Sequence, residues 1–315
     1  MRATACEKRI EEEARSRSHG NGAAVLASVM LLAAGSCAPD ATRERPAPAP
    51  AEPPDAPAVI ALIEAHNRRL DSLSKFWARG VLEFRWVDDE GDEHIEPQVN
   101  ARLWLDLPRR TALRAAKLDE VLFWLGSDPE HYWMFDLMGE ETVLYVGRHA
   151  ERPDARRNPL LVRPLALVDL LGLTPIPVPG SDDVPAGSSG WFSFDAERDA
   201  CAIRTQGAGG PIRVFLDRHG GLPVRVETLS RDGEVLLFSE LGRYASVPIR
   251  GVARAGRPKM PTLIDLADPA DTVFVKFALD QPSGDIEGQP WDRIFALSRL
   301  LQAMRPDRIE GDLTP

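Results

Sequence analysis

The chain has 315 residues, of which 43% are hydrophobic, and its formal net charge at pH 7 is −10. This length is enough to bury a sizeable core in one large domain or in two smaller ones. The acidic balance argues against a nucleic-acid-binding protein, because neutralising phosphates requires clustered Lys and Arg side chains.

An uncharged apolar run, "AAVLASVMLLAA", occupies residues 23–34. It is shorter than the roughly 20 residues that a membrane-spanning helix needs, and it is typical of the apolar region of an export signal. The "AGSC" that ends at Cys37 resembles the lipobox of bacterial lipoproteins, in which a peptidase cuts before the cysteine and the thiol is diacylated. The sequence therefore predicts a lipoprotein signal peptide over residues 1–37 and lipid attachment at Cys37. A secreted form without the lipid is the alternative.

Residues 38–57 predict a tether. Of the 21 residues from Ala38 to Ala58, 14 are Ala or Pro, which leaves too little apolar surface to offset the conformational entropy of the chain. Asp55 and Pro57 then suit the N-cap and first turn of a helix. Apolar residues at helical spacing predict that this amphipathic helix extends over residues 59–73. His66 lies on its apolar stripe, where a packed core histidine is the expected role.

Beyond the helix the apolar pattern changes to a period of two, which predicts strands. Short runs such as "FWARGVLEFRWV", "NARLWLDL" and "DEVLFWLG" are separated by turns that suit antiparallel neighbours. A second series follows residue 190, so that about eleven strands are expected. Two separate β-domains divided near Gly180 are the alternative to a single sheet.

Helices are expected at two further places. "RPLALVDLLGL", residues 163–173, predicts a helical insert, and "PWDRIFALSRLLQAM" predicts an amphipathic helix near the C-terminus. Several strands are apolar on both faces, with adjacent pairs such as Phe123 and Trp124. Both faces must therefore be covered by helices, or one face must line an apolar hollow.

The order and spacing of these segments resemble the LolA/LolB superfamily of lipoprotein carriers, from Ala58 to about Asp285. The resemblance is carried by "GVLEFRW", "NARLWLDLPRRTALRA", "VLFWLGSD", "FLDRHGGLPVRVETLSRDGEV" and "KMPTLIDLADPADTVFVKFAL". It implies a mainly β (α+β) fold, in which one curved antiparallel sheet forms an incomplete barrel with helices lidding its concave face. We therefore expect four regions along the chain: a lipoprotein signal peptide over residues 1–37, a tether over 38–57, a half-barrel domain over 58–285, and a C-terminal amphipathic helix and tail over 286–315.

The resemblance also implies a function. The cavity of such proteins receives acyl chains of lipids or lipoproteins, and the anchored receptor type is itself a lipoprotein with a protein carrier as its partner. We expect a monomer that is lipid-anchored, faces the periplasm and acts in lipoprotein localisation or lipid transfer. Ala38 after the cysteine, instead of Asp, favours the outer membrane. The anchored receptor also has a protruding apolar loop, for which the nearest candidate here is the very short "AKLDE" with Leu118.

Strand parity predicts which side chains face the cavity. Leu82, Phe84 and Trp86 share one face, opposite Glu83 and Arg85. Applied to the neighbouring strands and the helical insert, the same alternation completes the predicted ligand cavity as Leu82, Phe84, Trp86, Leu103, Leu105, Phe123, Leu125, Trp133, Phe135 and Leu170. A shift of one residue in the register of a strand would move its members to the other face.

No catalytic constellation is visible. The six histidines are scattered without metal-ligand spacing, and "GSSG" at 187–190 lacks the context of a nucleophile elbow. Cys201 lies in an apolar alternating run and is expected to be buried and inert. We therefore expect a protein that is not an enzyme and has no metal and no cofactor. A non-catalytic envelope scaffold or stress sensor on the same fold is the alternative to a lipid binder, and an unrecognised hydrolase is a third.

Overall fold

The computed structural model describes residues 53–88, 90–108, 110–149, 164–179 and 191–311. The predicted signal peptide, Cys37 and most of the tether lie outside these residues. So does "GSSG". Residues 50–315 form one compact unit.

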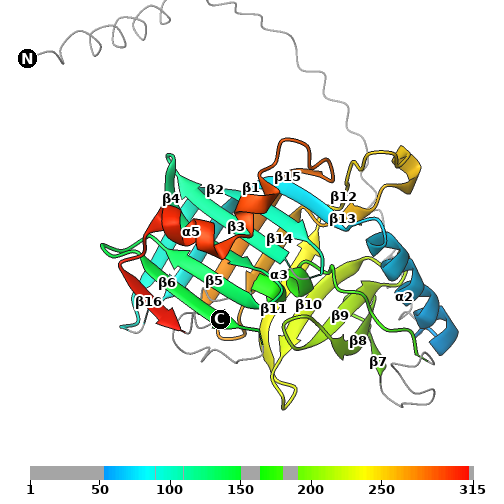
Figure 1. Ribbon diagram of the computed structural model, residues 1–315. Coiled ribbons are helices and arrows are strands. Elements are labelled where there is room, and N and C mark those ends of the chain that lie inside the picture. The colour runs from blue at the N-terminus through cyan, green and yellow to red at the C-terminus, as the bar shows by residue number, and fades with distance from the viewer. Residues whose placement is uncertain (1–52, 89, 109, 150–163, 180–190, 312–315) are drawn as a thin grey trace, which may run out of the picture. The chain divides into compact units, whose positions relative to one another are not determined.

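One sheet of 14 strands dominates the fold (Figure 1). Its strands in chain order are β1 (Lys75–Val87), β2 (Glu93–Asp106), β3 (Arg110–Lys117), β4 (Glu120–Ser127), β5 (His131–Asp136), β6 (Val143–Arg148), β7 (Phe192–Asp195), β8 (Ala200–Gln206), β9 (Pro211–Asp217), β10 (Pro223–Leu229), β11 (Val235–Gly242), β14 (Leu263–Ala267), β15 (Val273–Ser283) and β16 (Arg308–Gly311). A separate two-stranded sheet pairs β12 (Ala245–Ser246) with β13 (Lys259–Met260).

The strand order in the large sheet is β16-β6-β5-β4-β3-β2-β1-β15-β14-β11-β10-β9-β8-β7. All neighbours are antiparallel except β16, which lies parallel to β6. The long strand β1 pairs with β15 on one side and β2 on the other, so both halves of the chain share this sheet. This arrangement does not fit the alternative of two β-domains divided near Gly180.

A mainly β fold built on one large antiparallel sheet is confirmed, with more strands than the eleven expected. The strong curvature expected for it is wrong, because the sheet is neither closed nor strongly curled. Its edge strands β16 and β7 are both short. Short edges limit the unpaired backbone that an open sheet offers to other chains.

The first described helix, α2 (Ala56–Leu70), begins as the sequence predicts. The Asp55 side chain accepts a hydrogen bond from the Ala58 amide at 3.0 Å, and a proline occupies the first turn. The predicted stripe is buried at Val59, Ile63, His66 and Leu70. The helix ends at Leu70, three residues earlier than expected.

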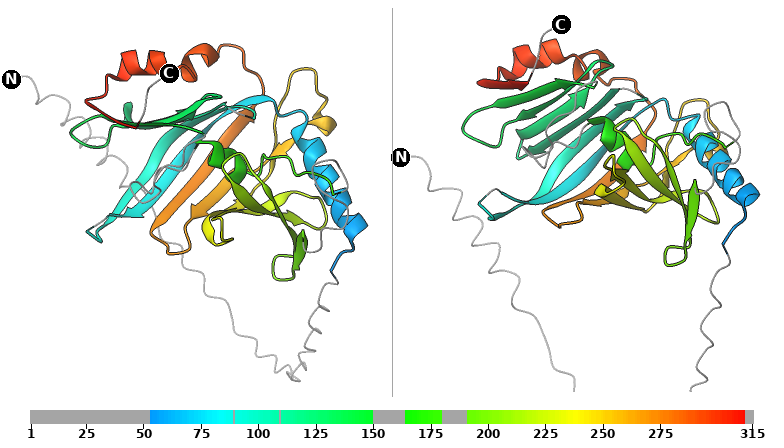
Figure 2. Two further views of the ribbon diagram at one scale, coloured as in Figure 1. Left: turned by 60° about the horizontal axis from the view of Figure 1, so that its bottom comes forward. Right: turned by 90° about the horizontal axis from the view of Figure 1, so that it is seen from below.

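The other helices cover the two faces of the sheet. The short α3 (Pro164–Leu170) contacts β3, β4 and β10 on the face that we call the inner face, which carries Leu82, Phe84 and Leu125. In place of the single C-terminal helix that was expected, α4 (Trp291–Ile294) is followed by α5 (Leu297–Met304). Both pack on the opposite, outer face (Figure 2). The strands that are apolar on both faces are thus covered on both.

Candidate functional site

An apolar cavity of about 70 Å³ lies between the inner face and α3. Every residue that lines it is apolar, and the residues come from strands of the large sheet and one helix: Leu82 and Phe84 from β1, Leu113 from β3, Phe123 and Leu125 from β4, Met134 from β5, Leu167 from α3, and Ile264, Leu266, Val273, Val275 and Phe277 from β14 and β15. Cross-strand pairing aligns these side chains, since Phe277 lies opposite both Leu82 and Ile264. The cavity is therefore a product of strand register, with the Leu167 side chain of α3 in its lining.

Seven of the ten predicted cavity residues lie on this inner face. Leu82, Phe84, Phe123 and Leu125 line the cavity itself. Trp86, Leu103 and Leu105 belong to the same apolar cluster without lining it. The Phe84 ring contacts those of Trp86 and Phe123, with centroids 5.5 and 5.8 Å away. Leu170 of α3 is fully buried but is not a lining residue, whereas Leu167, one turn earlier, is.

The placement of Trp133 and Phe135 on this face is wrong. Leu125 pairs with Met134, so the neighbours of Met134 point to the outer face, where Trp133 and Phe135 pack with Leu300 of α5. The segment "HYWMFD" is apolar on both faces, so alternation within β5 could not reveal which set points inward. Met134 is the β5 residue in the cavity.

A buried carboxylate fixes α3 in place. Asp169 is fully buried and accepts hydrogen bonds from the amides of Ala208 at 2.9 Å and Gly209 at 2.7 Å, and from the Thr174 hydroxyl. The glycines of the β8–β9 loop permit this approach, because a Cβ added at Gly207 would lie 2.6 Å from an Asp169 carboxylate oxygen. The "GAGG" turn thus binds the protein's own carboxylate with backbone amides.

The C-terminal end of α3 has further polar contacts. The Ser239 hydroxyl donates to the Leu170 carbonyl at 2.6 Å. Gly172 stops the helix with a φ of +64°, which residues with a side chain rarely adopt. Its carbonyl accepts a hydrogen bond from the Arg69 guanidinium of α2.

Helix α2 binds the segment that follows α3 through its polar residues. The His66 Nε2 lies 3.0 Å from the Thr174 carbonyl, and because a carbonyl only accepts, this nitrogen carries the proton. The Asn67 amide side chain pairs with both backbone groups of Ile176, at 2.8 and 2.9 Å. Sequence reasoning identified His66 as a core residue but did not identify Asn67, Arg69 or Asp169 as contacts of the insert. Asn67 and Arg69 bond Ile176 and Gly172 at separations of 109 and 103 residues, and Asp169 bonds Ala208 and Gly209 at separations of 39 and 40, beyond any local pattern.

Burial shifts the pKa values of two of these groups in opposite directions. Burial raises the pKa of Asp169 above its ordinary value, while the hydrogen bonds from Thr174, Gly209 and Ala208 oppose that rise. Burial, with the nearby Arg69 charge, lowers the pKa of His66 to about 4. His66 is therefore neutral at physiological pH.

Two other residues from the sequence analysis have clear positions. Cys201 is buried, as predicted, and burial raises the pKa of its thiol. Leu118 is 93% exposed at the tip of the two-residue turn between β3 and β4, where Leu118 and Asp119 have φ values of +49° and +71°. It is the most exposed large apolar residue among those described.

Within the described ranges, no three His, Cys, Asp or Glu side chains are grouped closely enough to hold a metal ion. None of the helices in the described part of the chain is both long enough and apolar enough to span a membrane.

Comparison with protein-family models gives no match, and comparison with curated proteins gives none either. Solved structures do match. A LolA superfamily protein from Nitrosomonas europaea is 12% identical, with a TM-score of 0.41, and the match covers 76% of this chain and 97% of that one. A DUF1329 family protein from Desulfovibrio piger is 10% identical, with a TM-score of 0.47 and coverage of 77% and 99%. An outer membrane lipoprotein-sorting protein domain from Vibrio parahaemolyticus is 9% identical, with a TM-score of 0.42 and coverage of 76% and 97%. This chain is thus similar to these three structures over about three quarters of its length, at 9–12% identity and with TM-scores below 0.5.

Proposed function

We propose that this chain is a non-catalytic, membrane-anchored binder of acyl chains in the cell envelope, acting in lipoprotein localisation or lipid transfer. The observation that carries the proposal is the wholly apolar cavity beneath α3. A buried hollow without one polar lining residue suits a hydrocarbon chain and offers no group that could orient a polar substrate.

The size of the cavity determines how such a ligand would enter. Ligand pockets usually measure about 300–1,000 Å³, far above the 70 Å³ beneath α3. A bound acyl chain must therefore take the place of Leu167 and move α3 away from the inner face. We propose that α3 acts as a lid that uncovers the inner face when it opens.

The proposal is tested by extracting the purified protein with organic solvent and identifying lipids by mass spectrometry. The wild-type chain should yield lipid in a stoichiometric amount, and Phe84→Asp should reduce it, since an unpaired charge in the cavity is costly. Glu83→Gln changes the exposed neighbour of Phe84 and should retain the lipid. Leu144→Asp places the same charge in the apolar cluster of the outer face and is the matched control for lost stability. Only variants that melt cooperatively are compared. Folded Phe84→Asp protein with a full lipid load would contradict the proposal.

A second candidate is a non-catalytic envelope scaffold or stress sensor on the same fold. The small volume of the cavity favours it, because side chains of the protein itself then fill the hollow. This function predicts that the purified wild-type chain yields no lipid above the level of Phe84→Asp.

The anchor is tested separately. Cys37→Ser should abolish incorporation of labelled palmitate, and incorporation by the variant would refute the lipobox. The wild-type protein should fractionate with the outer membrane, and recovery in the inner membrane would refute only that part of the proposal.

A further inference from the structure

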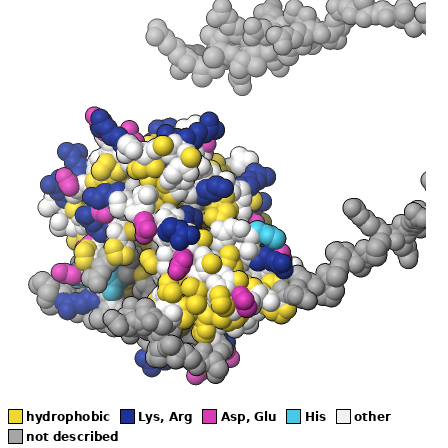
Figure 3. All heavy atoms as spheres, turned by 90° about the vertical axis from the view of Figure 1, so that its right-hand side faces the viewer, with side chains coloured by type: hydrophobic (Ala, Val, Ile, Leu, Met, Phe, Trp, Pro, Cys, Tyr) yellow, Lys and Arg dark blue, Asp and Glu magenta, His cyan; other side chains and the backbone are white. Residues whose placement is uncertain are grey.

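A second cavity, of about 530 Å³, lies between the C-terminal half of α2, the β9–β10 turn and the segment from the 3₁₀ helix η1 (Arg254–Gly256) to β13. Its volume falls in the range of small-molecule sites. Four of its lining residues, Arg68, Arg69, Arg257 and Lys259, are cationic and none is acidic. We call this cavity the basic groove. The side of the molecule that carries α2 faces the viewer in Figure 3, where Lys and Arg side chains are spread over the upper half.

Two of these cations have no counter-ion among the described residues. The structure records no ion pair for Arg257 or Lys259 there, and it records one side-chain hydrogen bond of Arg257, to the Val252 carbonyl at 3.5 Å. Arg68 is 3.7 Å from Glu64, an exposed pair that contributes little. The segment 250–259, "RGVARAGRPK", has four cations and no acid in a chain whose net charge is −10. Arg257 and Lys259 of this segment line the groove, whereas Arg250 lies 3.7 Å from Glu287.

Arg69 forms the floor of the groove and is held rigidly. Its guanidinium donates to the Lys259 carbonyl at 2.9 Å and to the Gly172 carbonyl, which fixes the direction of its charge. Its Nε is buried and has no hydrogen-bond partner among the described residues. Burial lowers the pKa of Arg69 to about 10, so the side chain remains charged at neutral pH. The buried Nε is not open to a ligand, so Arg69 contributes to the groove through its charge, which attracts an anion.

The Asp217 carboxylate, at the start of the β9–β10 turn, already has hydrogen-bond partners. Asp217 accepts hydrogen bonds from the amides of His219, Gly220 and Leu222 at 2.7 to 3.0 Å, so it is engaged by the backbone of its own turn. That turn approaches α2 closely, since a Cβ added at Gly221 would lie 2.8 Å from the Leu62 carbonyl. The walls of the groove formed by α2 and by this turn are thus fixed relative to each other before any ligand binds.

We propose that the basic groove binds the phosphate group of an anionic ligand. Converging Arg and Lys side chains supply the donors and the charge that phosphate oxygens require, and Arg can engage two oxygens at once. The same chemistry is offered by a soluble phosphate compound and by the headgroup of an anionic lipid. This site is distinct from the apolar cavity, and the proposal does not depend on the cavity or on the anchor.

The test compares three forms of the full chain, all carrying Cys37→Ser so that no acyl group contributes. The first has no other change, the second has Arg257→Gln with Lys259→Gln, and the third has Arg293→Gln with Arg299→Gln. The third removes the same charge from two exposed arginines of α4 and α5 for which the structure records no side-chain partner. Calorimetry measures the binding of inorganic pyrophosphate, and cosedimentation measures binding to vesicles of phosphatidylglycerol or phosphatidylcholine.

We expect the groove variant to bind at least tenfold more weakly than the first form, and the control variant to bind within twofold of it. Loss of pyrophosphate binding in the groove variant identifies a soluble phosphate ligand. If only phosphatidylglycerol vesicles bind, and the groove variant loses them, the source is a lipid headgroup. If the groove variant binds both probes as well as the control variant does, or if no form binds either probe, the proposal is overturned.

Melting temperatures give a second readout that a merely structural role would not produce. Without pyrophosphate the groove variant should melt at or above the temperature of the first form, because like charges have been removed. Pyrophosphate should raise the melting temperature of the first form and of the control, but not that of the groove variant. A groove variant that melts lower and is still stabilised by pyrophosphate would also overturn the proposal.

Discussion

Asp169 is the residue that most directly fixes α3 over the inner face. Its carboxylate is the only acceptor that the structure records for the Ala208 and Gly209 amides. Replacing Asp169 with Ala leaves these amides and the Thr174 hydroxyl without that acceptor. We expect Asp169→Ala to lower the free energy of unfolding by about 1–3 kcal/mol, measured by urea denaturation. Asp232→Ala, at an exposed turn, is the control and should have almost no effect. Equal effects of the two variants would show that Asp169 does not hold the helix.

His66 should make stability depend on pH over a defined window. Its pKa is about 4 in the folded protein against an ordinary value of 6.5, so the unfolded chain binds the proton more readily. The contribution of His66 to the free energy of unfolding is fully present above pH 6.5 and is lost as the pH falls towards 4. We expect wild-type protein to lose up to about 1.4 kcal/mol per pH unit within this window.

The control for this loss is His66→Gln, which has a donor for the Thr174 carbonyl and no titratable group. Its stability should be lower than that of the wild type at pH 7.5 but should change little between pH 6.5 and 4.5. Parallel pH profiles for the two proteins would contradict a buried neutral His66.

Among the elements, the β3–β4 turn departs most from the local preferences of its residues. Leu118 and Asp119 both have positive φ values, and two-residue hairpin turns of this kind favour Asn and Gly. Because Leu118 is 93% exposed, replacing it loses almost no packing. We expect Leu118→Asn to raise the free energy of unfolding by about 0.5–1 kcal/mol, measured by thermal or urea denaturation.

Leu236→Asn is the matched control, because Leu236 is exposed in the regular strand β11. It should be neutral or destabilising, since Asn is disfavoured in strands. A destabilised Leu118→Asn would show that the leucine makes contacts that the turn geometry does not reveal. If Leu118→Asn is more stable than the wild type, the leucine is retained in this turn at a cost in stability.

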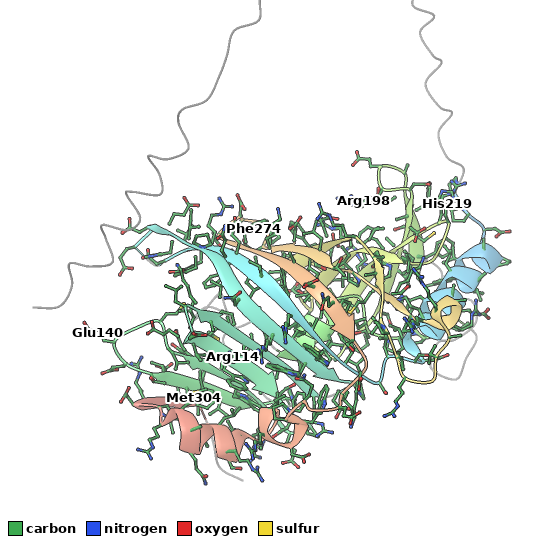
Figure 4. The ribbon with its side chains drawn as sticks, turned by 90° about the horizontal axis from the view of Figure 1, so that it is seen from above. Arg114, Glu140, Arg198, His219, Phe274 and Met304 are labelled. Atoms are coloured by element: carbon green, nitrogen blue, oxygen red, sulfur yellow. The ribbon has the colours of Figure 1, made fainter. Side chains whose placement is uncertain are left out.

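Elements whose signals lie close together in the sequence could be predicted, and elements that depend on distant contacts could not. The start of α2 depends on Asp55 and a proline within one turn, and the sequence predicted it. The face of β1 followed from clean alternation at residues 82–86, whereas the face of β5 did not, because its residues are apolar on both sides. The break between α4 and α5 and the parallel pairing of β16 with β6 were also missed. Helix α5 packs against the outer face, where its Met304 lies (Figure 4), and β16 pairs with a strand more than 160 residues away, so neither feature has a local signal.

In the whole molecule, different helices cover the two faces of the sheet. The outer face is covered by α4 and α5, which pack Ile294 and Leu300 beside tryptophans of the strands, together with Phe295 between the two helices. The inner face is covered near the cavity by the single helix α3, of seven residues, held through Asp169 and its last carbonyls. Of the two covers, α3 is the smaller, so its displacement exposes less apolar surface to water and costs less free energy. The opening of a lipid site is therefore expected on the inner face.

Shortening a buried leucine should affect lipid uptake differently on the two faces. Leu167→Ala enlarges the cavity beneath α3 and should destabilise the protein by about 2–5 kcal/mol, but it should also increase the uptake of a fluorescent fatty acid. Leu144→Ala removes the same atoms from the outer face and should cost a similar amount without increasing uptake. Equal uptake by the two variants would place the site elsewhere.

If α3 must move to admit an acyl chain, a reversible cross-link between α3 and the β8–β9 loop should block uptake. A Cβ added at Gly209 would lie 2.9 Å from the Cβ of Ala166, so a disulfide between cysteines at these positions requires a shift of roughly 0.5–1 Å. The variant Ala166→Cys with Gly209→Cys, in a Cys6→Ser and Cys37→Ser background, is incubated with the fluorescent fatty acid before and after reduction. The background protein without the new pair controls for effects of the reductant. We expect no uptake by the oxidised protein and uptake at the background level after reduction. Equal uptake in both states, or none in either, would show that movement of α3 does not admit the fatty acid.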